Sequence, residues 1–274
     1  MPKIILTGSD GMLGKALKKA LSASFDLHAF PKAELDITNS AAVEKVFSEI
    51  KPDFCVNAAG YTQVDRAESE QELAMRLNGE AVGLLGEECK KVGAKLIHFS
   101  TDYVFDGETK AGYLENAKPN PINFYGKSKL AGEQMLRESG CAFVIIRTSW
   151  LCGEGECFVS KMLELARRNS TLKVVADQQG SPTFTADLAE ATSKIIQKNL
   201  SGVFHRTNDG IVTWADFAKK IFEIKKLGVK VIPIKTAEFP TPAARPANSV
   251  LLNTKLPPLR KWEEGLRGYL KQGK

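Results

Sequence analysis

The first twenty-one residues restrict the fold of this chain more than any other stretch. Residues 3–7 form a short apolar run, and glycines follow at positions 8, 11 and 14. Apolar residues then recur at helical spacing between Ala16 and Leu21, which predicts a strand, a glycine turn and a helix. Glycines let a backbone approach a pyrophosphate, and a helix N-terminus offers free N–H groups. The segment therefore predicts a dinucleotide site; the alternative is a tight turn that uses glycine only for positive φ.

Strands and helices alternate along the first half of the chain. Apolar runs at residues 25–30, 54–60, 95–100 and 142–146 predict strands, and helical patterns at 40–50 and 68–92 separate the first of them. This alternation predicts an α/β fold with a doubly wound parallel Rossmann sheet. We expect an NAD(P)-binding domain over residues 1–150 and a smaller C-terminal α/β substrate-binding domain over residues 151–274. Within the second part, about residues 172–205 are expected to return and complete the Rossmann sheet.

A tyrosine and a lysine stand four residues apart at the head of a predicted helix. Tyr125 and Lys129 share one face of that helix because four residues make just over one turn. A free phenol titrates near ~10, and a neighbouring ammonium favours the phenolate and lowers that pKa. The pair therefore predicts acid/base chemistry. The alternative is an ordinary pair on a solvated helix, and only a cofactor site elsewhere in the chain argues against it.

The end of the second predicted strand bears on cofactor choice. A carboxylate about 20 residues after the glycines would accept from the ribose 2′-hydroxyl of NAD. This chain has Phe30, Pro31 and Lys32 there instead, so nothing repels a 2′-phosphate. We expect NADPH, with NADH left open, because Lys32 is equally well explained as a solvated loop residue. Asp36 is a candidate to accept from the adenine amino group.

Composition and charge exclude several classes of protein. The net charge of +6 is spread without a long basic run, so no nucleic-acid partner is expected. No window approaches the ~18 apolar residues of a membrane span, and the first apolar run is expected to be a strand rather than a signal peptide. The five cysteines show no C-x-x-C spacing, which predicts reduced thiols, no metal and a cytoplasmic location.

The chain resembles the extended short-chain dehydrogenase/reductase family over almost all of its 274 residues. The glycine spacing G-x-x-G-x-x-G is the form that this family uses, and several later motifs are more specific. The motifs that carry the resemblance are residues 7–14, 35–39, 57–65, 100–107, 125–129, 147–150, 177–183, 245–249 and 262–266.

The resemblance implies NADPH-dependent reduction of the C4 ketone of a dTDP-linked 4-keto-6-deoxyhexose, giving dTDP-L-rhamnose for a cell-surface polysaccharide. It implies that Thr101, Tyr125 and Lys129 are catalytic, and that the substrate lies against Thr101, Asp102, Tyr125 and Trp150. The residues expected to bind the cofactor are Gly8, Asp10, Gly11, Met12, Leu13, Gly14, Lys32, Asp36, Ile37, Ala58, Ala59, Gly60, Tyr125 and Lys129. Gly60 departs from the family, where alanine is expected.

Two of the substrate assignments have a plain structural alternative. Trp150 is either a flat apolar wall for the sugar or a core residue at a strand end. Arg245 lies in a proline-rich loop, and its guanidinium is a candidate for the diphosphate. A salt bridge between loop and helix explains Arg245 equally well.

Rival functions remain at this point. A sugar-nucleotide 4,6-dehydratase would carry an acid pair directly after the threonine, whereas here Thr101 is followed by Asp102 and Tyr103. A regulatory subunit like that of methionine adenosyltransferase resembles the same family and acts by association. Another 4-keto sugar nucleotide is a further alternative. The family also leaves a homodimer open and sometimes uses Mg²⁺ in it, which nothing in this sequence supports.

Overall fold

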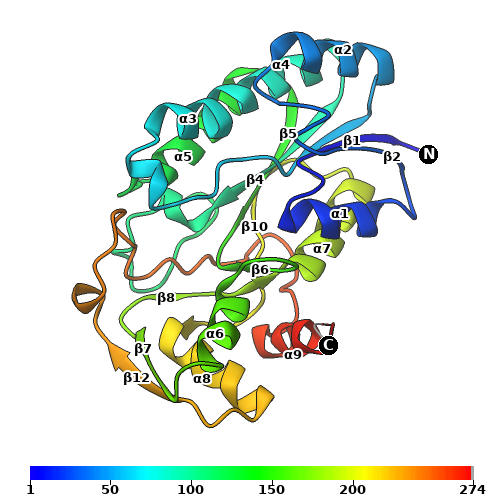
Figure 1. The fold of residues 1–274 in the computed structure, drawn as a ribbon. Coiled ribbons are helices and arrows are strands. Elements are labelled where there is room, and N and C mark those ends of the chain that lie inside the picture. The colour runs from blue at the N-terminus through cyan, green and yellow to red at the C-terminus, as the bar shows by residue number, and fades with distance from the viewer. Residues whose placement is uncertain (273–274) are drawn as a thin grey trace.

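A computed structural model of the protein describes residues 1–272, and a parallel sheet lies at its centre. Within these residues, six strands pair in the order β10-β5-β4-β3-β1-β2, all of them parallel (Figure 1). Their bounds are β1 Lys3–Thr7, β2 Asp26–Phe30, β3 Phe54–Asn57, β4 Lys95–Thr101, β5 Ala142–Thr148 and β10 Gly202–His205. The chain first moves outward from β1 to β2 and then crosses back to β3. Ligands bind at such a reversal, beyond the carboxyl ends of the strands.

Helices cover both faces of the sheet, which confirms the predicted doubly wound fold (Figure 1). On one face lie α1 (Met12–Leu21) and α7 (Thr185–Gln197). On the other face lie α2 (Ser40–Ile50), α4 (Ala81–Val92) and α5 (Phe124–Glu138). The helix α2 begins where predicted, because the Asn39 side chain accepts from the backbone N–H of Ala42 at 3.1 Å.

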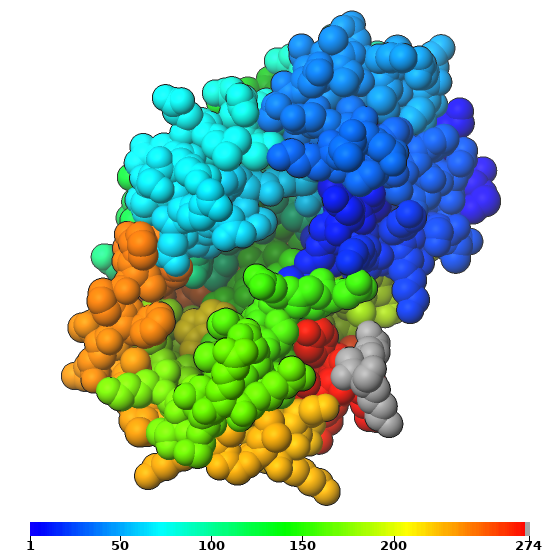
Figure 2. Space-filling view, viewed as in Figure 1, coloured from blue at the N-terminus to red at the C-terminus, as the bar shows by residue number. Residues whose placement is uncertain are grey.

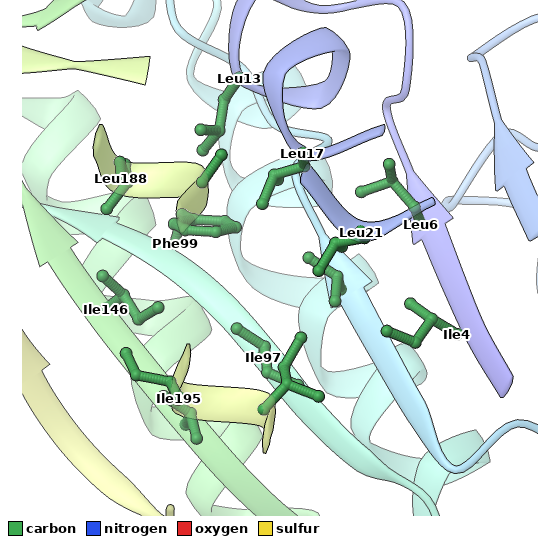
Figure 3. Close-up of a cluster of buried hydrophobic side chains, with 14 of the residues drawn as sticks. Ile4, Leu6, Leu13, Leu17, Leu21, Ile97, Phe99, Ile146, Leu188 and Ile195 are labelled. Atoms are coloured by element: carbon green, nitrogen blue, oxygen red, sulfur yellow. The ribbon is translucent and has the colours of Figure 1, made fainter. Parts of the chain in front are cut away.

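The core beneath α1 explains why the opening segment folds as it does. Leu13, Leu17 and Leu21 recur at helical spacing and point onto the sheet, where they meet apolar strand residues (Figure 3). Each is at most 8% exposed, and full burial of such a side chain stabilises the fold by about 1.5–3 kcal/mol. On the same face of the sheet, α7 contributes Leu188 and Ile195 to this cluster (Figure 3). The glycine turn is therefore attached to a rigid layer.

A smaller α/β layer follows the sheet. It contains three short strand pairs, β7 (Thr171–Val175) with β12 (Lys230–Ile234), β8 (Gln179–Gly180) with β11 (Val212–Thr213), and β6 (Leu151–Cys152) with β9 (Thr183–Phe184). The helices α6 (Phe158–Ala166), α8 (Trp214–Lys225) and α9 (Trp262–Gln272) pack around a core of their own. Of the segment expected to return to the main sheet, β10 lies beside β5, whereas β7 pairs with β12. The domain boundary at residue 150 stays a prediction.

The helix predicted over residues 68–92 is present as an unbroken helical run over residues 71–92, but its type changes along its length. The 3₁₀ turn η1 (Arg66–Glu68) is followed by α3 (Gln71–Met75), the π-helical segment η2 (Arg76–Glu80) and only then by α4. At the centre of η2, the buried Asn78 side chain accepts from the backbone N–H of Tyr61 at 2.8 Å and donates to the carbonyl of Tyr61 and to Ser128 Oγ, both at 3.0 Å. These bonds join three segments, and π segments are frequent at functional sites.

The helix α5 approaches its neighbours so closely that only glycine fits at two positions. A Cβ atom on Gly126 would lie 2.1 Å from the carbonyl oxygen of Tyr103. A Cβ atom on Gly132 would lie 2.0 Å from the carbonyl oxygen of Asn78. Both neighbours are backbone atoms and cannot rotate away, so these glycines set the distance between α5 and the segments beside it.

We expect Gly132→Ala to destabilise the protein although alanine is the better helix former. The added methyl group must push α5 away from η2, and overpacking of this kind costs about 1–3 kcal/mol. Gly228→Ala is the control, because a Cβ atom there has no atom within 4 Å. Urea unfolding followed by circular dichroism measures both, and equal midpoints for the two variants would contradict the close contact at Gly132.

Candidate active site

The glycine turn after β1 is shaped to receive an anion. Gly8 has φ of +64°, and a Cβ atom on it would lie 2.6 Å from the backbone nitrogen of Ala59. A Cβ atom on Gly14 would lie 2.1 Å from the carbonyl oxygen of Gly8, so α1 packs directly on the turn. Gly11 precedes the helix and provides no side-chain cap, which leaves backbone N–H groups of the first turn open to a ligand. These residues fit the pyrophosphate of a dinucleotide.

The corner beyond β2 is electropositive. The Asp36 carboxylate accepts from Thr38 N at 2.9 Å and from Thr38 Oγ1 at 2.8 Å, and these bonds lower its pKa. Lys32 and Arg76 are close enough to lower that pKa further. Arg76 lies in η2 and was not among the predicted residues, because only the fold brings it to this corner. Two cations near the adenosine end fit a 2′-phosphate.

The other predicted cofactor residues lie in different surroundings. Leu13 and Ile37 are buried in the two cores that flank the sheet. Asp10 and Gly60 are exposed, whereas Met12, Ala58 and Ala59 are half-buried. An alanine at position 60 would place its Cβ atom 3.0 Å from Asn78 Oδ1, which is tight contact. Their contact with a cofactor stays a prediction.

At the end of β4, a threonine and an aspartate are bonded to each other. Thr101 Oγ1 donates to Asp102 Oδ1 at 3.0 Å and accepts from the backbone N–H of Tyr103 at 3.2 Å. Asp102 is 3% exposed, and its Oδ2 makes no hydrogen bond of good geometry among the described residues, although the Ser249 hydroxyl is close enough to lower its pKa. Burial raises the pKa of Asp102 to about 6, and an unpartnered oxygen this deep is open to a ligand hydroxyl.

Tyr125 lies on α5 beside these two residues. Burial and, to a smaller extent, the Asp102 charge raise its pKa to about 12, while the nearby Thr101 hydroxyl acts in the opposite direction. The expectation that Lys129 lowers the phenol pKa is not met in this structure. Lys129 Nζ instead donates to the Phe99 carbonyl at 2.6 Å, and across residues 1–272 no hydrogen bond joins it to the phenol. Burial also lowers the pKa of Lys129, to about 8.

Aromatic residues form one wall opposite the sheet. Trp150 has φ of +48° and stacks on Trp214, with ring centroids 3.4 Å apart and planes 7° from parallel. Phe158 packs against Trp214 from α6, and Trp214 Nε1 donates to Gln178 Oε1 at 3.2 Å. Trp214 was missed by the sequence reasoning, since it lies 64 residues after Trp150 (214 − 150) with no local motif around it. Between these segments and the N-terminal half, the molecule is hollowed (Figure 2).

Arg245 adopts the contact that the sequence left as its alternative. Its Nη2 donates to Asp65 Oδ2 at 2.9 Å, and its Nη1 donates to the carbonyl of Ala243 at 3.0 Å. The guanidinium carbon also lies 5.9 Å from the centre of the Tyr103 ring. The pair ties the proline-rich loop to the segment after β3, and binding of a diphosphate by Arg245 stays a prediction.

Three further properties of residues 1–272 concern membrane spans, metal sites and cysteines. No helix within residues 1–272 is long and apolar enough to cross a membrane. Over the same range, no group of three or more His, Cys, Asp or Glu residues is arranged to hold a metal ion. The five cysteines are free thiols.

The doubly wound sheet, the glycine turn and the Thr101–Tyr125–Lys129 cluster define a Rossmann-fold protein of the short-chain dehydrogenase/reductase class. Within that class, the chain belongs to the family described as the RmlD substrate binding domain, which matches residues 2–274.

Individual relatives agree over nearly the whole chain. The spore coat polysaccharide biosynthesis protein SpsK of Bacillus subtilis is 38% identical over 99% of this chain and 98% of its own length. A dTDP-4-dehydrorhamnose reductase of Burkholderia thailandensis is 38% identical over 93% of this chain and 91% of its own. The crystal structure of dTDP-4-dehydrorhamnose reductase from Bacillus anthracis, in complex with NADP, has 41% identity and a TM-score of 0.96, covering 99% of both chains.

We expect Lys32→Glu to weaken NADP binding more than NAD binding, because the new carboxylate repels the 2′-phosphate. One charge-assisted contact is worth about 1.5–3 kcal/mol, and less when exposed, so the selectivity ratio should fall about 3- to 30-fold. Lys45→Glu, the same charge change on exposed α2, is the control. Titration calorimetry with both dinucleotides measures the ratio, and an unchanged ratio would remove Lys32 from the site.

Proposed function

We propose that the protein reduces the C4 ketone of dTDP-4-dehydro-6-deoxy-L-mannose with NADPH and so produces dTDP-L-rhamnose. The observation that carries the proposal is that the buried Thr101 ends β4, on the sheet edge where the glycine turn lies, and that α5 carries the half-buried Tyr125 and the buried Lys129 beside it. Membership of the RmlD family supports the same reaction, and so does its similarity to dTDP-4-dehydrorhamnose reductases.

Two side chains then act at the ketone together with the bound dinucleotide. The bound dinucleotide supplies a hydride to C4. Tyr125 donates its phenolic proton to the C4 oxygen as negative charge develops there, and Thr101 Oγ1 hydrogen-bonds the same oxygen. The high pKa of Tyr125 supports this assignment, because the phenol keeps its proton at neutral pH until the oxygen becomes basic.

NADPH is the favoured cofactor for two reasons. The relative from Bacillus anthracis was crystallised with NADP. In this chain, Lys32 and Arg76 lie near Asp36 at the adenosine corner, and no carboxylate stands at the end of β2. NADH remains the alternative.

The same geometry supports a position for the sugar nucleotide. Asp102 Oδ2 would accept from a sugar hydroxyl, and Trp150, supported by Trp214, would present a flat face to the ring. Arg245 would reach the diphosphate only by exchanging or sharing its contact with Asp65. We also propose a cytoplasmic location. The family resemblance leaves a homodimer and a use of Mg²⁺ open.

The direct test is turnover. Purified protein with NADPH and dTDP-4-dehydrorhamnose should consume NADPH, and the product should be identified as dTDP-L-rhamnose. Absence of turnover with this and other 4-keto sugar nucleotides would favour the regulatory role. Turnover with a different hexulose alone would keep the chemistry and change the substrate.

We expect Tyr125→Phe to lower kcat by about 10²–10⁴, the usual contribution of a positioned general acid. The ring remains, so NADPH should bind with nearly unchanged affinity. Tyr103→Phe is the matched control, because Tyr103 packs edge-on against Tyr125 with centroids 5.9 Å apart. Stopped-flow measurement of NADPH oxidation decides, and near-normal turnover by Tyr125→Phe would reassign the proton donor.

The pH dependence should report Lys129. Its pKa is lowered to about 8, so the ammonium is present below that pH and is lost above it. If the charged form serves catalysis, kcat/KM for NADPH falls about tenfold per pH unit above about 8, since this parameter reports the free enzyme. A limb that begins only near the ordinary lysine value of about 10.4 would contradict the assignment.

A further inference from the structure

A row of buried polar side chains crosses the sheet beneath the site. It begins at Thr7 on β1, continues through Asn57 on β3 and His98 on β4, and ends at Lys129 on α5. The successive distances are 2.7 Å from Thr7 Oγ1 to Asn57 Oδ1, 3.2 Å from Asn57 Nδ2 to His98 Nδ1, and 3.2 Å from His98 Nε2 to Lys129 Nζ. All four residues are at most 6% exposed. The positions of the hydrogens along this buried row follow from those neighbouring groups that can only donate a hydrogen bond.

The orientation of the Asn57 amide is set by the backbone. The N–H of Ala59, which can only donate, points at the Asn57 oxygen at 3.1 Å, and the Thr7 hydroxyl donates to the same oxygen. The amide nitrogen of Asn57 must therefore face His98 and donate to Nδ1.

His98 is consequently held in one tautomer. Its Nδ1 accepts from Asn57, so the ring hydrogen of the neutral imidazole lies on Nε2. Burial and the Lys129 charge hold the pKa of His98 well below its usual range, so the ring is neutral. The Nε2–H group faces Lys129 Nζ at 3.2 Å. An ammonium has no lone pair to accept this hydrogen, whereas an uncharged amine has one.

We infer that His98 is a positioning residue for Lys129, and that its Nε2–H group donates to the uncharged amine and stabilises that form. The inference deepens the proposed function and rests on it for its catalytic meaning. Lys129 can then alternate between two bonded states: the ammonium donates to the Phe99 carbonyl, and the amine both donates to that carbonyl and accepts from His98.

The proton balance of the reaction gives this arrangement its use. The phenolic O–H bond of Tyr125 breaks as the C4 oxygen is protonated, which leaves a phenolate. One N–H bond of the Lys129 ammonium then breaks, water between the two groups carries the proton to the phenolate, and the electron pair stays on the amine, which accepts from His98. Solvent returns the proton to Lys129 after the products leave.

Other charged groups act on this lysine. Glu133 lies one turn further along α5 and favours the ammonium, but Arg147 holds its carboxylate at 2.7 Å. Asp102, from the turn after β4, acts on Tyr125. Thr7 and Asn57 carry no charge. His98 is therefore the side chain on β4 that favours the uncharged amine of Lys129 over its ammonium form.

The first experiment is independent of catalysis. In cofactor-free protein labelled with ¹⁵N-histidine, long-range ¹H–¹⁵N correlation spectra distinguish the tautomers of the three histidines, and His98→Gln assigns the signals. We expect His98 to be neutral with its hydrogen on Nε2 from pH 6 to 9. A hydrogen on Nδ1, or an imidazolium, would overturn the inference whatever the protein catalyses.

The second experiment measures the effect on Lys129. In His98→Gln the side-chain amide can turn its oxygen toward the ammonium, so the pKa of Lys129 should rise by about one to two units. The ¹³Cε chemical shift of Lys129 follows this titration, and the alkaline limb of kcat/KM should move with it.

His205→Gln is the matched control for the second experiment. It removes another buried imidazole of the same sheet, on β10, whose Nε2 lies 3.5 Å from Arg147. We expect this variant to lose stability without moving the Lys129 titration by more than a few tenths of a unit. An unmoved titration in folded His98→Gln would overturn the inference. Failure of the unsubstituted protein to turn over sugar nucleotides would overturn the proposed function and leave the ¹³C and ¹⁵N measurements to decide the role of His98.

Discussion

The buried ion pair between Glu133 and Arg147 holds α5 on the sheet, and the site depends on the position of α5. Both side chains are at most 2% exposed, and the guanidinium binds the carboxylate through two bonds of 2.8 and 2.7 Å. Loss of one partner from such a pair typically costs about 3–5 kcal/mol, because the other charge remains buried. Tyr125, Lys129 and Glu133 are four residues apart and lie on one helix face, so the pair fixes the phenol and the ammonium together.

The same ion pair leaves Lys129 only weakly held in its charged form. A free carboxylate at position 133 would keep a buried lysine fully protonated, but Arg147 and Arg137 already neutralise it. Burial therefore prevails, and the pKa of Lys129 falls to about 8. The contact between Glu133 and Arg147 thus anchors α5 and also weakens the one carboxylate that opposes the effect of burial on Lys129.

Short-range patterns were sufficient to predict the fold class, whereas the residues that they assign to the site stay predictions. The glycine turn is confirmed as the link between β1 and α1, because its glycines, strand and helix are adjacent in sequence. Long-range pairings could not be predicted in this way. The π segment depends on Asn78 bonding to Tyr61 and Ser128, and the wall behind Trp150 depends on Trp214. The roles assigned to Thr101, Tyr125 and Lys129 stay predictions, since residue types at a spacing do not fix where hydrogen bonds end.

The arrangement of charge around the Tyr125 phenol favours its protonated form, which is the form that a reduction requires. A neighbouring ammonium would favour the phenolate, which suits removal of a proton from an alcohol. Here the ammonium is drawn back to the Phe99 carbonyl, and the carboxyl group of Asp102, with a pKa of about 6, is mostly ionised at neutral pH beside the phenol. Both features keep the proton on Tyr125 in the absence of ligand. In the proposed reaction, the resting protein would therefore hold the proton that a carbonyl oxygen requires as it is reduced, and Lys129 would supply the proton that replaces it.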